Sequence, residues 1–204
     1  MAKAKTKKTK KKKSKEPPRP NDALGCDPGK YNFGWAHYDR EEGLLRTGVI
    51  DGIDGIEHLE NFRKQFLQLL KVTEPGCIGI ERFHNRPGRG GKRNMELVNL
   101  AIGLMVEICI KKKIPWKLVV ASAHKRWLAK NFEVGLTEEG ERLKQQAAKA
   151  RKRKKKTKKT KKRFPRKITK KFDITTYHEW EGLETEHECD AATIAKYTLE
   201  KIFV

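Results

Sequence analysis

The stretch that decides the fold is "ALGCDPGKYNFGWAHY", residues 23–38, in which a short apolar run ends at Asp27 and turns through Pro28 and Gly29. Residues 23–26 have the composition of a buried strand. After the turn, residues 31–39 and 44–51 alternate apolar and polar side chains on either side of the polar turn 40–43, which predicts two antiparallel strands. The chain therefore opens with a three-stranded meander, and a carboxylate stands at the end of its first strand.

The residues that follow alternate between helix and strand patterns. Apolar side chains at helical spacing predict a helix that buries Ile56, Leu59, Phe62, Phe66, Leu69 and Leu70. We then expect a strand over 76–83, a loop over 84–94, an apolar helix over 95–110, a strand over 116–122 and a helix from Ala123. Residues 172–188 look irregular or partly extended, and 189–204 form a final amphipathic helix. This βββαβαβα order predicts an α/β fold with a mixed sheet flanked by helices.

The net charge of +22 is concentrated in two segments. Residues 1–20 hold ten Lys/Arg and one Glu, and residues 144–171 hold seventeen Lys/Arg and no acid, so the rest of the chain sums to about −4. We expect a disordered basic tail over 1–21 and a domain over 22–204 with a disordered basic insertion at about 141–171. Such lysine runs attract nucleic acid without base readout, although a nuclear-import signal uses the same residues.

The cysteines and the apolar segments indicate an intracellular protein. Cys26, Cys77, Cys109 and Cys189 are far apart and form no CxxC pair, so we expect reduced thiols rather than disulfides or a zinc site. The N-terminus has no apolar signal-peptide core, and no apolar stretch is long enough to span a bilayer. A cytoplasmic location is the resulting expectation.

Three carboxylates have apolar neighbours: Asp27, Glu81 at the end of the strand "GCIGIERF", and Asp190 in "ECDAATIAKY". Each has an ordinary interpretation, as a turn residue, an exposed strand end and a helix cap. An isolated buried carboxylate is costly, however, and three of them suit a site for Mg²⁺ or Mn²⁺. Two such ions would support hydrolysis of a phosphodiester, one activating water and the other stabilising the leaving oxygen.

The same segments resemble the three motifs of the RuvC Holliday junction resolvases, which belong to the ribonuclease-H-like nucleases. "ALGCDPGKYNFGWAHY" resembles the first motif, "GIERF" the second and "HECDAATIAKY" the third, in the family's order. The resemblance implies that Asp27, Glu81, His187 and Asp190 are catalytic and hold two Mg²⁺ or Mn²⁺ ions. It also implies that the apolar helix 95–110 helps to form a homodimer.

Candidate DNA contacts flank these motifs. The stretch "VVASAHKRWLAK" resembles the family segment in which a lysine approaches DNA, here Lys125, and Phe83 or His84 stands near the family's junction-entering aromatic. The loop "HNRPGRGGKRN" supplies Arg86, Arg89, Lys92 and Arg93 as phosphate contacts, although it could equally be a solvated loop. Its glycines lack the spacing of a nucleotide-binding loop. The basic insertion departs from the family pattern and suggests a viral or divergent member.

The sequence thus predicts a metal-dependent DNA endonuclease of the RuvC type that nicks paired strands of a four-way junction as a homodimer. Two alternatives stay open at this point. One keeps the fold and acts on RNA–DNA hybrids or flaps. The other is a non-catalytic basic protein that binds nucleic acid and uses the three acids only structurally.

Overall fold

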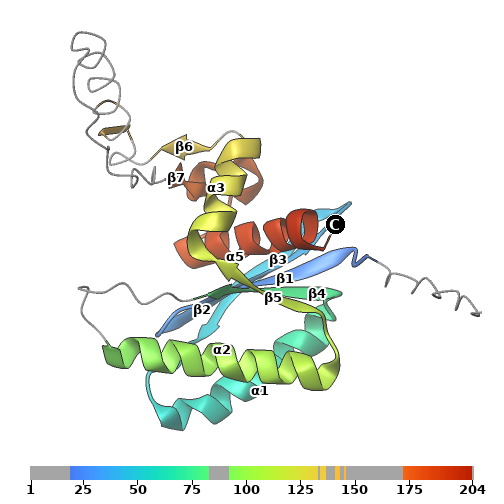
Figure 1. Ribbon diagram of the computed structural model, residues 1–204, viewed down its shortest axis with the longest axis vertical. Helices are drawn as coiled ribbons and strands as arrows, with labels where there is room; N and C mark the ends of the chain where they lie inside the picture. Colours follow the sequence, from blue (N-terminus) through green and yellow to red (C-terminus); the bar gives the residue numbers. More distant parts are fainter. Residues whose placement is uncertain are drawn as a thin grey trace, which may run out of the picture.

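A five-stranded mixed sheet forms the centre of the computed structural model, which describes residues 19–82, 92–132, 134–136, 141, 142, 145 and 172–203 (Figure 1). Its strands lie in the order β3-β2-β1-β4-β5. The strand bounds are β1 Asp22–Pro28, β2 Asn32–Asp39, β3 Gly43–Asp51, β4 Cys77–Arg82 and β5 Trp116–Val120. Strands β1, β2 and β3 pair antiparallel, whereas β4 pairs parallel with both β1 and β5. The predicted mixed α/β fold is confirmed.

Helices cover both faces of the sheet. On the lower face in Figure 1 lie α1 (Leu59–Thr73), which follows the 3₁₀ turn Ile56–His58, and α2 (Lys92–Lys112). On the upper face lie α3 (Ala121–Asn131) and α5 (Glu186–Tyr197), and α5 continues into a π-helical turn, Thr198–Ile202. Two short strands, β6 (Gly135–Leu136) and β7 (Phe172–Asp173), pair antiparallel beyond the end of α3, and 3₁₀ turns at Ile174–Thr176 and His178–Trp180 lead back to α5.

The central strand β1 is buried on both faces because helices cover each of them. Side chains alternate along a strand, so Leu24 and Cys26 join the core under α1 and α2, while Ala23 joins the core under α5. Strand β4 repeats this arrangement: Ile78 and Ile80 face the lower helices. These two strands therefore fix which residues face α5.

Helix α5 lies against the sheet over glycines of three neighbouring strands, Gly34 of β2, Gly25 of β1 and Gly79 of β4. A Cβ at Gly25 would lie 2.0 Å from the Ala191 carbonyl oxygen, and one at Gly34 would lie 2.4 Å from the His187 carbonyl oxygen. Gly25 and Gly79 are partners in the β1–β4 ladder. We call these three residues the glycine track; it lets the helix backbone approach the sheet more closely than any side chain would allow.

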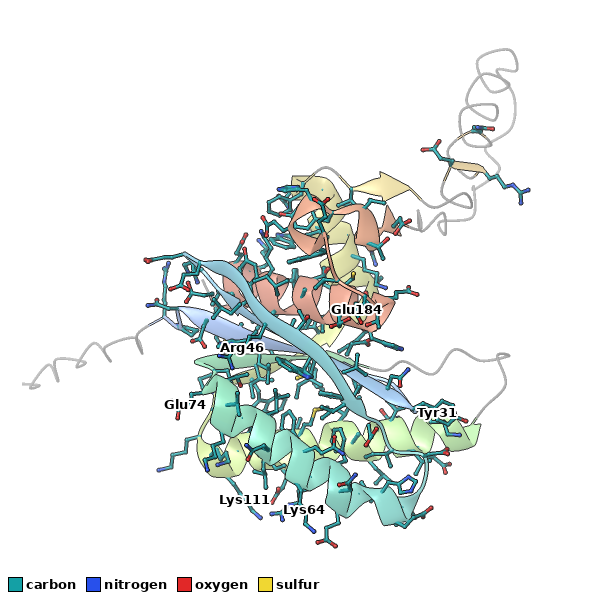
Figure 2. The ribbon with its side chains drawn as sticks, turned by 180° about the vertical axis from the view of Figure 1, so that it is seen from behind. Tyr31, Arg46, Lys64, Glu74, Lys111 and Glu184 are labelled. Atoms are coloured by element: carbon teal, nitrogen blue, oxygen red, sulfur yellow. The ribbon has the colours of Figure 1, made fainter. Side chains whose placement is uncertain are left out.

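The lower core is built on aromatic residues. The rings of Phe33 and Phe62 meet edge to face with their centroids 5.3 Å apart, and Phe66 packs beside both. Ile56 was expected in this core but is 70% exposed, because the 3₁₀ turn that carries it precedes the helical periodicity of α1. Figure 2 shows Lys64 and Lys111 on the outer side of these helices, pointing away from the sheet.

The upper core holds a buried ammonium. Lys196 of α5 contacts both carboxylate oxygens of Glu179 at 2.6 Å and donates to the Tyr177 hydroxyl at 3.1 Å. Its Nζ also lies 4.6 Å from the centroid of the Phe132 ring. This network joins the segment that returns from β7 to helix α5, so the segment expected to be irregular is a packed part of the domain.

Several predicted boundaries need correction. The last helix begins at Glu186 rather than near Cys189, because Thr185 and Glu188 form a reciprocal capping box at its N-terminus. Helix α2 begins at Lys92, inside the predicted loop, and α3 begins at Ala121. The four cysteines are buried and free, as expected. Among the described residues, no helix has the length and apolar character needed to cross a membrane.

The lysine-rich tail and most of the lysine-rich insertion lie outside the described residues. The predicted domain limits therefore stay predictions.

Candidate active site

Asp27 and Glu81 lie on the same face of the sheet as the glycine track, because side chains alternate between the two faces along a strand. Asp27 follows Gly25 by two residues in β1, and Glu81 follows Gly79 by two residues in β4, so both acids face α5. The parallel β1–β4 ladder pairs Cys26 with Ile80, one residue before each acid. The two carboxylates are therefore neighbours at the same end of the sheet.

Helix α5 brings two further groups to this end. His187 and Asp190 are three residues apart, so they lie on one face of the helix, and the capping box at Thr185 begins the helix early enough to include His187 in its first turn. The close seat of α5 over Gly34 and Gly25 holds that face directly above the ends of β1 and β4. The sequence had suggested that His187 precedes the last helix, but in the structure it belongs to that helix.

These side chains line one cavity of about 270 Å³. Its wall consists of Asp27, Pro28, Gly29, Glu81, Glu186, His187 and Asp190. Figure 2 shows Tyr31, which follows the cavity-lining turn, at one end of the sheet and Glu74 at the other. The structure therefore brings all four predicted catalytic residues together at a single end of the sheet.

Asp27 is paired with His187. The His187 Nδ1 lies 2.7 Å from the Asp27 Oδ2, and the Asp27 side chain is only 14% exposed. An ionised carboxylate can only accept a hydrogen bond, so we assign the hydrogen to Nδ1. The hydrogen bond to Asp27 raises the pKa of His187 above its ordinary value, against the opposing effect of burial. The contact with Asp27 therefore favours the protonated imidazole.

Asp190 is paired with two consecutive residues of α3. The Lys125 Nζ lies 2.6 Å from Oδ1 and 2.8 Å from Oδ2, so the ammonium spans the carboxylate. The His124 Nε2 lies 3.6 Å from Oδ1. Burial favours a raised pKa for Asp190, but the contacts with His124 and Lys125 outweigh it and leave the pKa below its ordinary value.

Within the described part of the chain, no cation is recorded in contact with Glu81 in the way that His187 contacts Asp27 and Lys125 contacts Asp190. Burial, and then the charges of Asp27 and Asp190, raise the pKa of Glu81 to about 8, although Lys125 acts in the opposite direction. Asp27 and Asp190 thus each contact a basic side chain, whereas the raised pKa favours the protonated form of Glu81.

The chemistry of these side chains fits a hard divalent cation. Three carboxylates and an imidazole line one cavity, and the pKa of Glu81 is raised first by burial and then by the two neighbouring acids. In the described part of the chain, however, no three His, Cys, Asp or Glu side chains are arranged closely enough to hold a metal ion as they stand. Asp27 and Asp190 are instead turned toward His187 and Lys125, so a metal would have to replace those contacts.

The predicted DNA contacts are only partly visible. Lys125 lies beside Asp190, as described above. Phe83, Arg86 and Arg89 lie outside the described residues, and the Lys92 and Arg93 backbones belong to α2 while their side chains are outside the description.

Sequence reasoning missed His124 as a site residue. It is fully buried, neither ring nitrogen has a hydrogen-bond partner among the described residues, and its Nε2 lies 3.6 Å from the Asp190 Oδ1. Its position next to Lys125 in "SAHKRW" was the available signal.

Comparisons with known proteins add a fold assignment. No protein-family model matches the sequence, and no curated protein matches it either. Among solved structures, Thermus thermophilus RuvC in complex with a Holliday junction substrate is similar at 16% identity and a TM-score of 0.51, covering 85% of this chain and 90% of that chain. A second Thermus thermophilus RuvC structure gives 17% identity and a TM-score of 0.50 over the same shares of each chain.

The yeast mitochondrial Holliday junction resolvase is also found, at 16% identity and a TM-score of 0.47, covering 88% of this chain and 78% of that chain. The likeness to the two RuvC structures confirms that this chain has the ribonuclease-H-like fold.

Proposed function

We propose that this protein is a metal-dependent endonuclease that resolves four-way DNA junctions by nicking paired strands. The observation that carries the proposal is the convergence of Asp27, Glu81, His187 and Asp190 on one cavity at the ends of β1 and β4. The fold shared with RuvC, a protein solved with a Holliday junction substrate, supports a junction as the substrate class.

Asp27, Glu81 and Asp190 would hold two Mg²⁺ or Mn²⁺ ions, with His187 as a further ligand or a proton carrier. When bound, such ions supply an activated water and stabilise the charge that develops on the leaving oxygen. His187 can hold a proton at Nδ1 against Asp27, since the hydrogen bond to Asp27 raises its pKa above the ordinary value. Glu81 must lose the proton that it retains in the metal-free site.

The remaining residues would bind and orient the DNA. Lys125 and the basic loop residues Arg86, Arg89, Lys92 and Arg93 are the proposed phosphate contacts, and Phe83 is the proposed junction-entering aromatic. The lysine-rich tail and insertion would add affinity that depends on salt but carries no sequence preference.

The proposed homodimer would pair through α2. Leu100 is 45% exposed and Ile110 is 61% exposed on this helix, which leaves apolar side chains available to a second copy. Light scattering in solution should give twice the monomer mass, and the substitution Ile110→Glu should reduce it to the monomer mass. A monomeric parent protein would contradict this part of the proposal.

The test of the activity compares four substrates in Mg²⁺: a four-way junction, a linear duplex, a flap and an RNA–DNA hybrid. We expect symmetric nicks in the junction and little cutting of the other three. Preference for the hybrid or the flap would replace the resolvase by a related nuclease. No cleavage of any substrate would favour a non-catalytic nucleic-acid-binding protein.

Two isosteric variants assign the chemistry to this cavity. Asp27→Asn and Glu81→Gln each replace a carboxyl group by an amide that cannot ionise, with almost no change in side-chain volume. We expect both to lose Mg²⁺-dependent cleavage and keep junction binding. Glu60→Gln on α1, which carries an exposed carboxylate paired with Lys64, is the matched control and should cleave like the parent protein.

A further inference from the structure

Lys125 was expected to contact DNA, but in the structure its ammonium is paired with the Asp190 carboxylate. Its ammonium spans both oxygens of Asp190, at 2.6 and 2.8 Å, and its side chain is 30% exposed. The Asp190 side chain is 12% exposed, so little of the carboxylate is left for water. The lysine therefore holds the carboxylate through which the proposed metal would bind.

We propose that Lys125 is an internal cation that holds Asp190 in the metal-free protein and is displaced when a divalent cation binds. This inference rests on the proposed function, because it concerns the metal site of that function. This role of Lys125 differs from that of a simple phosphate contact, because the position of the lysine would depend on whether a metal is bound.

The geometry gives the physical reason for displacement. The Lys125 ammonium donates a hydrogen bond to Oδ2 at 2.8 Å and lies 2.6 Å from Oδ1, so it stands where a hard cation would approach the carboxylate. Among the described residues, Oδ1 itself has no hydrogen-bond partner and therefore keeps a lone pair for such a cation. A divalent ion and an ammonium on the same carboxylate would also repel each other in a partly buried cavity. Lysine is suited to leave, because a compact charge on a flexible four-carbon stem can move without moving its helix.

The contacts around Asp190 make the exchange possible without disordering the acid. His124, the preceding residue of α3, is fully buried 3.6 Å from the Oδ1 atom and remains on the inner side of the carboxylate when Lys125 leaves. A released Lys125 is then free to contact a phosphate. This sequence of states reconciles the observed ion pair with the expected role of Lys125 in DNA binding.

The first test measures Mn²⁺ binding to the full-length protein without DNA, by calorimetry and by the electron paramagnetic resonance of free Mn²⁺. The variants are Lys125→Met, which removes the internal cation, and Lys130→Met, which removes an exposed charge from the same helix. We expect Lys125→Met to bind Mn²⁺ about tenfold more tightly, in the range of ordinary site-to-site coupling, and Lys130→Met to bind within about twofold of the parent.

The second test follows the lysine itself. Acetylation of surface amines, read by mass spectrometry, should modify Lys125 slowly in the metal-free parent protein and several-fold faster in saturating Mn²⁺. Lys130 should react at the same rate in both conditions. Removal of a nearby positive charge in Lys125→Met could by itself raise the affinity for Mn²⁺. It would not make the Lys125 amine of the parent protein react faster when Mn²⁺ binds.

The outcomes separate this inference from the proposed function. If the parent protein binds Mn²⁺ and cleaves junctions but Lys125→Met binds Mn²⁺ no more tightly, only the displacement idea is overturned. An unchanged acetylation rate of Lys125 on Mn²⁺ addition overturns it as well. If the parent protein binds no Mn²⁺, both the displacement and the metal-dependent function are wrong.

Discussion

The glycine track makes a quantitative prediction at Gly25. In the variant Gly25→Ala, the new Cβ would meet the Ala191 carbonyl oxygen at 2.0 Å and the Ala195 amide nitrogen at 2.5 Å. Ordinary contacts begin at 3.4 Å, so α5 would have to move away from β1 by more than 1 Å. Both obstructing atoms belong to the helix backbone, and no rotamer change can relieve the clash.

The expected cost follows from this displacement. Overpacking a close-packed core costs about 1–3 kcal/mol, and a clash with two backbone atoms places Gly25→Ala at about 3 kcal/mol. In a domain of this size that free energy lowers the melting temperature by about 9 °C. Because α5 carries His187 and Asp190, a shift of about 1 Å should also reduce junction cleavage about 100-fold.

Denaturant unfolding and junction cleavage in Mg²⁺ measure the two effects. The matched control is Gly103→Ala in α2, where a Cβ would meet nothing within 4 Å. This variant should gain about 0.5–1 kcal/mol from the better helix propensity of alanine. A Gly25→Ala protein as stable and as active as the parent would refute the close seat of α5 on β1.

Three further predictions follow from single side chains. Glu81→Gln should raise the melting temperature of the metal-free protein at pH 8 but not at pH 4. The folded protein keeps a proton on Glu81 up to about pH 8, whereas the unfolded chain loses it near the ordinary pKa of a glutamate. The stability of the parent protein therefore falls as the pH rises between these two values, and the glutamine variant escapes this loss. Lys196→Met leaves the Glu179 carboxylate without its buried cation and should cost about 3 kcal/mol in denaturant unfolding, whereas the exposed Lys201→Met should change stability by less than about 0.5 kcal/mol. Thr185→Ala removes the side-chain cap of α5 and should cost about 1 kcal/mol by the same measurement; equal stability would mean that the capping box contributes nothing.

The sequence predicted the five strands of the main sheet and the principal helices, because each depends on a short-range pattern. Period-two alternation located β2 and β3, short apolar runs located β1 and β4, and the apolar neighbours of Asp27, Glu81 and Asp190 marked the acids as unusual. The site also depends on the parallel pairing of β1 with β4, which joins residues as distant as Ala23 and Cys77 and is seen in the structure.

What the sequence did not reveal depends on contacts between distant residues. The buried cation at Lys196 could not be recognised, because its partners Glu179 and Phe132 lie on separate segments. The ion pair between Lys125 and Asp190 joins residues 65 positions apart. The capping box "TEHE" was different: its Thr185 and Glu188 were legible in the sequence and would have placed His187 inside the helix.

The pairing of β6 with β7 has a consequence for how this domain can vary among related chains. Leu136 and Phe172 are direct partners in that ladder, and 35 residues separate them in the sequence. Because β6 and β7 pair directly, the two ends of the intervening stretch are held side by side whatever number of residues separates them. Insertions or deletions between Leu136 and Phe172 would therefore alter the lysine content of the chain while leaving the cavity at the ends of β1 and β4 in place.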